Sequence, residues 1–414
     1  MASLRRSLVG SLAIGLAACS YYDSSLLNPT STTGGEGGSG GASGQPSGGA
    51  AGARPGGAAG ASAGAGGSAA GATGEAGYGG ETREVNGLVK PVGPPKTKPT
   101  KTDGVDLVLA LKAIDFGEQS NAYKQYGFDL DGANTQSPGG DDPTCKGYSS
   151  KASDYNDNEG GRDNAFGQLV TSISKFLTDF QSSHFNDNVA DGTFSILLHV
   201  ENYNGERNDD QVTLSWLVGD NFPKGKKPAF DGTDSWPIQD TSYLDDGKSP
   251  PTARYSDVNA YVTDGVLVGS LPGGKITTPS FTLELTAPLL VATLRAPDTT
   301  SPLWRIESGT IAARWPTKTL FSQIGRFKDP FGGTDKPICR NSVSYAGIKS
   351  SICAAADISS SVLDIQPNIP CSALSMALRV QAVQAKVGPT VATASKPILC
   401  DQGQSPEGDD CDQP

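Results

Sequence analysis

The strongest helical pattern in the chain lies between Asp163 and Gln181. Its apolar residues recur at steps of three and four, which places them on one face of a helix. They are Phe166, Leu169, Val170, Ile173, Phe176, Leu177 and Phe180. Asp163 and Asn164 stand where the first turn needs a cap, because both side chains accept hydrogen bonds from free backbone N–H groups. The sequence therefore predicts a helix that begins at this pair and buries its apolar face.

Most other apolar segments after residue 103 have the composition of β-strands. They are rich in β-branched residues, and several alternate apolar and polar positions, as a strand with one buried face does. The predicted strands are 105–116, 193–203, 211–218, 258–271, 281–296, 303–315 and 375–383. Asn204 and Gly205 form a turn signal, so we expect the second and third of these strands to form a hairpin with a longer loop.

Few helices separate these strands. Two further helices are predicted, at 317–327 and at 341–355, although Gly347 weakens the second. Because each crossover of a parallel sheet needs a covering helix, the pattern favours an antiparallel sheet. We therefore expect a mainly β domain, an antiparallel β-sandwich of the jelly-roll kind with about three peripheral helices. An α+β fold is the alternative.

The first 102 residues differ from the rest in composition. Between 34 and 80 nearly every residue is Gly, Ala or Ser, a composition that cannot bury enough apolar surface to fold. Residues 90–101 interleave Pro and Lys, which is typical of a stiffer, extended stalk. We expect 20–102 to be a disordered, low-complexity tether and 103–414 to be a single folded domain.

Residues 1–19 have the pattern of an export signal, with Arg5 and Arg6 ahead of an apolar stretch too short to span a bilayer as a helix. The stretch ends in Leu16-Ala17-Ala18-Cys19, which resembles the lipobox of bacterial lipoproteins. The resemblance implies cleavage before Cys19 and acylation of its thiol, with palmitate among the acyl chains. Ser20 implies sorting to the outer membrane. The alternative is an ordinary secretory signal. The folded part resembles exported proteins of bacteria with large secretomes, a resemblance that implies no activity.

Six cysteines remain when Cys19 is set apart, and an even number in an exported chain indicates three disulfides with fifteen possible pairings. They are Cys145, Cys339, Cys353, Cys371, Cys400 and Cys411. A helix at 341–355 would hold Cys339 and Cys353 roughly 20 Å apart, beyond the limit of about 7 Å for a disulfide. We expect Cys400 and Cys411, which flank a Gly/Pro/Asp loop, to pair locally. The other four would staple the C-terminal third to the core.

Charge and motifs narrow the function. The whole chain carries −11 and residues 1–102 contribute +3, which leaves −14 for the folded part. A domain this acidic repels the phosphate backbone, so we do not expect a nucleic-acid partner. The folded part has no G-x-S-x-G, H-E-x-x-H, P-loop or dinucleotide motif, and the chain has only two histidines. We therefore assign no catalytic residue, and the pattern leaves enzymatic activity open while favouring a protein without it.

The stretch from 129 to 163 carries eight carboxylates with Gly and Asn between them. Ca²⁺ takes six to eight oxygen ligands, and Asp and Asn at alternate positions supply them on one side of a loop. The predicted ligands are Asp129, Asp131, Asp154, Asn156, Asn158 and Asp163. The loop is not an EF-hand, because glycine falls at the seventh position and alanine at the twelfth. Calcium is thus the one cofactor that the pattern suggests. The competing interpretation, which we favour slightly, is a solvated loop whose last aspartate caps the helix.

Three functions remain after these exclusions. We favour a lipid-anchored binding module on the outer membrane or cell surface that recognises glycan or protein, because the chain combines a lipid, a long tether and no catalytic motif. One alternative is an extracellular hydrolase with Asp129, Asp131 or Asp163 as acid and base. The other is a purely structural protein of the cell envelope.

Overall fold

The computed structural model describes residues 85, 87–96, 104–136, 140–151, 157–333, 336–363, 366–393 and 400–412. The predicted signal, including Cys19, and most of the predicted tether lie outside these residues, as do Asp154 and Asn156. None of the described helices is long and apolar enough to cross a membrane.

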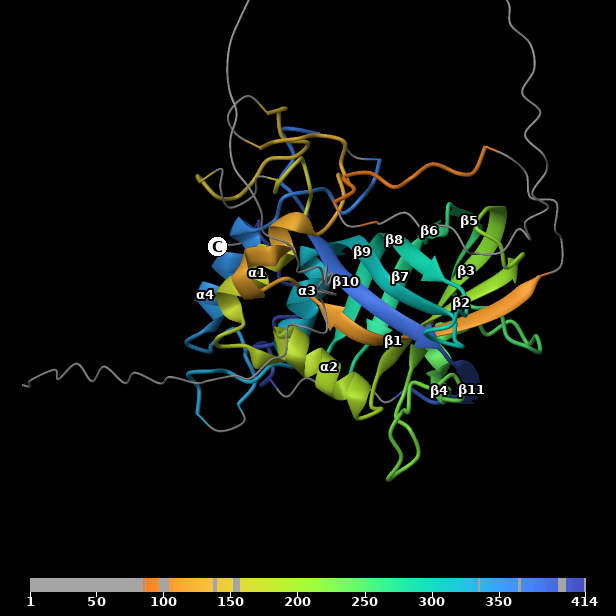
Figure 1. Ribbon diagram of the computed structural model, residues 1–414. Helices are drawn as coiled ribbons and strands as arrows, with labels where there is room; N and C mark the ends of the chain where they lie inside the picture. The colour runs from red at the N-terminus through yellow and green to blue at the C-terminus, as the bar shows by residue number, and fades with distance from the viewer. Residues whose placement is uncertain are drawn as a thin grey trace, which may run out of the picture. The chain divides into compact units, whose positions relative to one another are not determined.

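The chain folds around one 11-stranded sheet (Figure 1). Its strands are β1 (Val105–Asp115), β2 (Ser195–Tyr203), β3 (Asp209–Gly219), β4 (Ser235–Gln239), β5 (Tyr255–Thr263), β6 (Val266–Ser270), β7 (Gly273–Thr277), β8 (Thr282–Arg295), β9 (Arg305–Pro316), β10 (Ala373–Gln384) and β11 (Lys386–Val391). Neighbours pair in the order β11-β4-β3-β2-β1-β10-β9-β8-β6-β5, with β7 on β8. All pairs are antiparallel except β11 with β4.

The sheet closes on itself because β3 also pairs with β5. Eight strands complete this closed ring, and β4, β7 and β11 lie outside it. The mainly β, antiparallel prediction is confirmed, but the closed sheet differs from the two-layer jelly-roll sandwich that we expected. The reason lies in the segment predicted as one strand at 258–271. Asp264 and Gly265 take positive φ values of 52° and 79°, which reverse the chain between β5 and β6 and let β5 reach β3.

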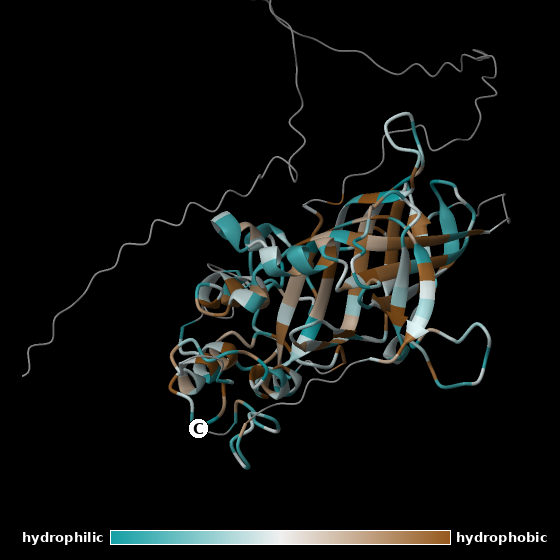
Figure 2. Cartoon of the chain, turned by 90° about the horizontal axis from the view of Figure 1, so that it is seen from below, coloured by the Kyte–Doolittle hydropathy of each residue, from teal (hydrophilic) through white to brown (hydrophobic). Residues whose placement is uncertain are grey.

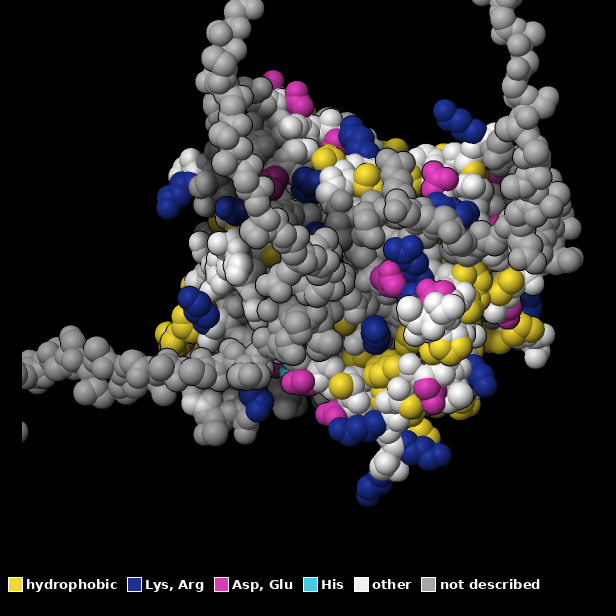
Figure 3. All heavy atoms as spheres, in the orientation of Figure 1, with side chains coloured by type: hydrophobic (Ala, Val, Ile, Leu, Met, Phe, Trp, Pro, Cys, Tyr) yellow, Lys and Arg dark blue, Asp and Glu magenta, His cyan; other side chains and the backbone are white. Residues whose placement is uncertain are grey.

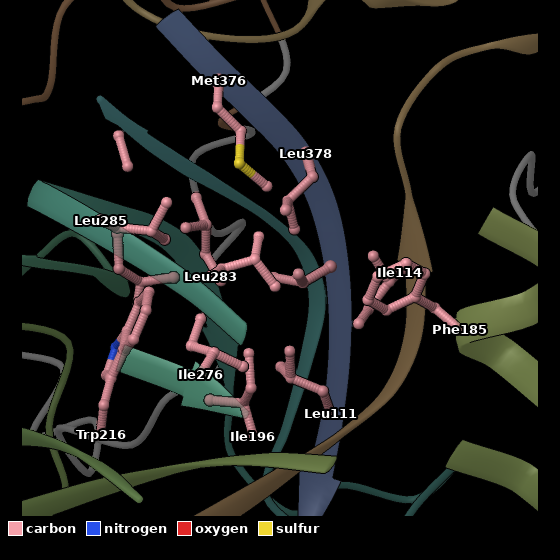
Figure 4. Packing of buried hydrophobic residues seen from close by; sticks show 14 of the residues in the cluster. Leu111, Ile114, Phe185, Ile196, Trp216, Ile276, Leu283, Leu285, Met376 and Leu378 are labelled. Carbon is pink, nitrogen blue, oxygen red and sulfur yellow. The ribbon is translucent and has the colours of Figure 1, made fainter. Parts of the chain in front are cut away.

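Inward-facing apolar side chains fill the closed sheet. Figure 4 shows Trp216, Ile196, Ile276, Leu283 and Leu285 facing one another between strands that are distant in sequence. These residues alternate with outward-facing ones along each strand, as the pleat of a sheet requires. Hydropathy follows the same division, with hydrophobic colour along the strands and hydrophilic colour on the outer loops (Figure 2).

Helices gather at one end of the sheet (Figure 1). They are α1 (Ala165–Ile173), α2 (Ser182–Ala190), α3 (Thr317–Ile324) and α4 (Tyr345–Ala354). α1 packs on β10, α2 on β1, and α3 on β8 and β9. Eight aromatic rings fill the space between these helices and the sheet, with contacting centroids 4.6–6.5 Å apart. They are Phe116, Phe166, Phe180, Phe185, Phe194, Phe281, Trp315 and Phe327.

The predicted helix at 163–181 is shorter than expected. Asn164 alone caps it, accepting a hydrogen bond from the Gly167 N–H, and α1 ends at Ile173. The Gln181 side chain then donates to the Ser174 carbonyl and satisfies an acceptor at the end of the helix. A 3₁₀ turn, η4 (Thr178–Phe180), and α2 follow, so Phe176 is exposed and does not join the core. The predictions at 317–327 and 341–355 are confirmed as α3 and α4.

Three disulfides join the six predicted cysteines. The pairs are Cys145–Cys371, Cys339–Cys400 and Cys353–Cys411. The exclusion of Cys339–Cys353 is confirmed, because α4 separates the two residues. The local pair Cys400–Cys411 is wrong. The C-terminal segment instead runs along α4, where the Tyr345 hydroxyl and the Lys349 ammonium bind Asp409, and each cysteine at its ends meets a different partner.

Candidate functional site

The predicted acidic stretch folds into two adjoining segments ahead of α1. Asn158 and Arg162 pair across a tight turn, where Gly160 and Gly161 take φ values of 74° and 82° that favour glycine. The Asp163 N–H then donates to the Phe128 carbonyl at 3.0 Å. This pairing brings the 128–131 segment alongside residue 163, although the two are separated by a long loop in the sequence.

Three predicted ligands meet in this arrangement. Asp129, Asp131 and Asp163 each offer one carboxylate oxygen, and these oxygens lie within 4.8 Å of one another. Asn158 instead stabilises the turn, because its side-chain Nδ2 donates a hydrogen bond of 3.4 Å to the Arg162 carbonyl. It is not among the residues that the structure brings to this group.

Asp163 is the most deeply buried member, with no solvent-exposed surface. Its Oδ2 accepts a hydrogen bond of 2.5 Å from the Leu130 N–H, whereas its buried Oδ1 has no hydrogen-bond partner among the described residues. Burial, followed by the charges of Asp131, Asp357 and Asp157, holds the pKa of Asp163 well above its ordinary value. The negative charge of an ionised Asp163 is therefore only partly balanced by the donors around it.

Two carboxylates that the sequence analysis did not single out complete what we call the acidic cluster, which comprises Asp129, Asp131, Asp157, Asp163 and Asp357. Burial is the first cause of the raised pKa of Asp157, against hydrogen bonds from Thr135 that lower it. Burial likewise raises the pKa of Asp357 to about 7, although its carboxylate accepts hydrogen bonds from the Ser375 N–H and Oγ. Asp357 comes from the loop before β10, so only the fold brings it here.

Two cations offset part of this charge. The Arg314 guanidinium, from β9, is buried and donates to the Leu130 carbonyl at 2.5 Å. The Lys90 ammonium lies 3.0 Å from Asp129 Oδ2, with 70 % of the lysine side chain exposed. Two cations against five carboxylates leave three negative charges uncompensated if every carboxylate is ionised.

A second feature lies on another part of the sheet. A pocket of about 530 Å³ is bordered by β7, the start of β8, the end of β4 and α3. A second pocket of about 560 Å³ shares Thr241, Lys275 and Glu284 with the first. The two therefore adjoin, and we call them together the polar groove.

Neutral polar side chains dominate the lining of the polar groove. They are Thr193, Asn221, Gln239, Thr241, Thr277, Thr278, Ser280, Thr282, Gln323 and Thr393. Lys275 and Glu284 neutralise each other in an ion pair of 2.8 Å. The half-buried ring of Tyr255 borders the groove beside Gly273, where a Cβ atom would stand 3.7 Å from the ring. This lining offers hydrogen-bond donors and acceptors, with one aromatic face and little net charge.

Neither the polar groove nor the acidic cluster has the geometry that serine or carboxylate catalysis requires. In the polar groove, Ser280 Oγ lies 3.2 Å from His184 Nε2, a contact that a serine nucleophile would need. However, the Ser280 and Phe281 N–H groups donate to Thr278 Oγ1, so they are not free to stabilise an oxyanion. In the acidic cluster, the complete burial of Asp163 leaves a polymer substrate no access to that carboxylate.

The sequence could not have revealed the polar groove, because its lining comes from seven separate segments that only the fold assembles. No family model matches the chain, and neither a curated protein nor a solved structure matches it.

Proposed function

We propose that the protein is a lipid-anchored binding module of the cell surface that holds a neutral, hydroxyl-rich ligand, a glycan, in the polar groove. The lipobox ending at Cys19 supports the anchor, and the Gly/Ala/Ser-rich stretch at 20–102 supports a long reach from the membrane. The three disulfides support an oxidising compartment outside the cytosol. Ser20, next to the acylated cysteine, favours the outer membrane.

The lining of the polar groove carries the proposal. A glycan presents hydroxyl groups that both donate and accept hydrogen bonds, and Thr, Ser, Asn and Gln side chains match both roles. Glycans also present apolar C–H faces, and the Tyr255 ring offers a flat surface for one of them. Lys275 and Glu284 neutralise each other, and Asp220 offsets one of the two remaining charges, those of Arg254 and Arg326. The lining therefore carries at most one net positive charge, which disfavours a strongly charged ligand.

The surface charge agrees with a neutral ligand. On the face drawn in Figure 3, basic and acidic side chains are interspersed, with no broad patch of either sign on the coloured part of the surface. A polyanion would need a basic surface, and the folded part of this chain carries −14 after the +3 of residues 1–102 is removed from the total of −11.

The test is a glycan array probed with the full, detergent-purified chain. We expect binding to a restricted set of neutral oligosaccharides and about a two- to tenfold loss of affinity in Tyr255→Ala, since one stacking contact is worth about 0.5–1.5 kcal/mol. Phe176→Ala is the matched control, because this exposed aromatic residue does not line the groove. Binding that is absent from every neutral glycan, or unchanged in Tyr255→Ala, contradicts the proposal.

A further inference from the structure

We propose that the acidic cluster binds a divalent cation, Ca²⁺, through Asp129, Asp131 and Asp163, and that the ion fastens the 129–163 segment to the closed sheet. The site is separate from the polar groove, so the inference stands or falls independently of glycan binding.

The spacing of the three carboxylates suits one shared ion. Ca²⁺ binds oxygen at about 2.3–2.6 Å, so two oxygens on opposite sides of the ion stand about 4.6–5.2 Å apart. The three carboxylate oxygens all lie within 4.8 Å of one another. They can therefore reach a common ion with small side-chain adjustments.

The unsatisfied oxygen of Asp163 points to a ligand independently of the number of acidic residues. Buried polar atoms in folded proteins almost always have a partner, and a charged one without a partner is costly. Asp163 Oδ1 is fully buried, on a side chain that faces Asp129 and Asp131, and no described N–H or hydroxyl donor reaches it. The Asp163 carboxyl also meets the carboxyl of Asp157, which adds a further negative charge when both are ionised. A cation between the three carboxylates would supply the missing partner and reduce their repulsion.

The donor set selects the type of metal. All three ligands are carboxylate oxygens, which suit hard cations such as Ca²⁺. Zinc would need histidine or cysteine. His184 and His199 bind Ser280 and Asp106 elsewhere in the structure, and the six described cysteines are in disulfides.

Lys90 stands at the solvent side of the site and competes with the ion. Its ammonium pairs with Asp129 Oδ2, but most of the lysine side chain is exposed and can turn away without losing packing. Removing this charge should therefore strengthen calcium binding, whereas removing a ligand charge should weaken it. The two opposite effects separate a metal site from a merely acidic loop.

The experiment is calorimetric titration of CaCl₂ into the full, metal-stripped chain, with a thermal melt in EDTA and in millimolar Ca²⁺. The variants are Asp163→Asn, Lys90→Gln and, as a matched control, Asp187→Asn on the exposed side of α2. We expect saturable binding, a higher melting temperature with Ca²⁺, at least a tenfold loss of affinity in Asp163→Asn, tighter binding in Lys90→Gln, and no change in Asp187→Asn.

Several results would overturn the inference. These are a parent chain that shows neither binding heat nor a calcium-dependent melting temperature, or a Lys90→Gln variant whose calcium affinity does not rise. An equal response to Mg²⁺ would overturn the assignment to calcium. If Asp163→Asn does not fold, Lys90→Gln still decides the matter, because its exposed side chain contributes little to the packed structure.

Discussion

The buried carboxyl of Asp357 should make the metal-free protein less stable as the pH rises. Burial raises its pKa to about 7, from an ordinary aspartate value of 3.8, and the neighbouring charges of Asp157 and Asp131 act in the same direction. Between these two values the folded state binds a proton that the unfolded state has released. The stabilisation is complete below about pH 4 and is lost as the pH rises through 7.

The magnitude follows from this difference in pKa. A change of about three pKa units corresponds to about 4 kcal/mol of unfolding free energy, at about 1.36 kcal/mol for each unit. Asp131, Asp157, Asp163 and Arg314 face the same space and remain in place, so the effect is measured best as a difference between two chains.

Asp357→Asn provides that difference. The asparagine keeps an oxygen to accept the Ser375 N–H and cannot titrate. Urea unfolding of the full parent and variant chains in EDTA, at pH 4.5 to 8, should show the parent losing about 3 kcal/mol relative to the variant, with most of the loss before pH 7.5, because part of the total is already lost at pH 4.5. Parallel pH profiles for the two chains would refute the reasoning, as would a parent that gains stability relative to the variant with rising pH.

Three further predictions follow from the fold and the anchor. Replacing both Cys145 and Cys371 by Ser should cost about 5 kcal/mol of unfolding free energy, because the loop that this disulfide closes has a sequence separation of 226 residues; an unfolding midpoint unchanged in urea would contradict it. Phe180→Ala should cost about 3–5 kcal/mol, because its buried ring packs in the aromatic cluster, whereas the exposed Phe176→Ala should change stability by less than about 0.5 kcal/mol. If the two variants changed the unfolding free energy in urea equally, the aromatic rings between the helices and the sheet would not be the core of the helical end of the domain. Cys19→Ser should move the protein out of the detergent phase in a partition assay, or leave its signal uncleaved; a variant that partitions like the parent would exclude the lipid anchor.

Local patterns were sufficient to predict much of the secondary structure. The alternation in β2 and β3 and the turn signal at Asn204-Gly205 predicted their hairpin correctly, since register in a hairpin depends on nearby residues. The hairpin of β5 and β6 was missed although Asp264-Gly265 is a two-residue hairpin signal in the sequence. The closure of the sheet could not be predicted, because the pairing of β3 with β5 joins strands that β4 and its long flanking loops separate. β4, β7 and β11 were also missed. They are short, and all three contain glycine or proline, which weakens the strand signal.

The acidic cluster was predictable only in part. Asp129, Asp131 and Asp163 belong to one dense acidic stretch, so composition alone pointed to them. Asp357 comes from a distant loop that packs against β10, and nothing in its local sequence marks it as a neighbour of Asp163. The predicted pair Cys400–Cys411 was wrong for the same reason. The partner of Cys400 depends on where the fold places the C-terminal segment, and not on the short sequence separation of Cys400 and Cys411.

Hydrogen–deuterium exchange of the full chain, with and without a bound glycan from the array, tests the central claim most directly. A glycan in the polar groove should slow exchange in β7 and at 239–241 and 277–284, while the 129–163 segment exchanges as before. Protection confined to other parts of the chain would contradict the assignment of the groove, as would a glycan that leaves exchange in β7 unchanged.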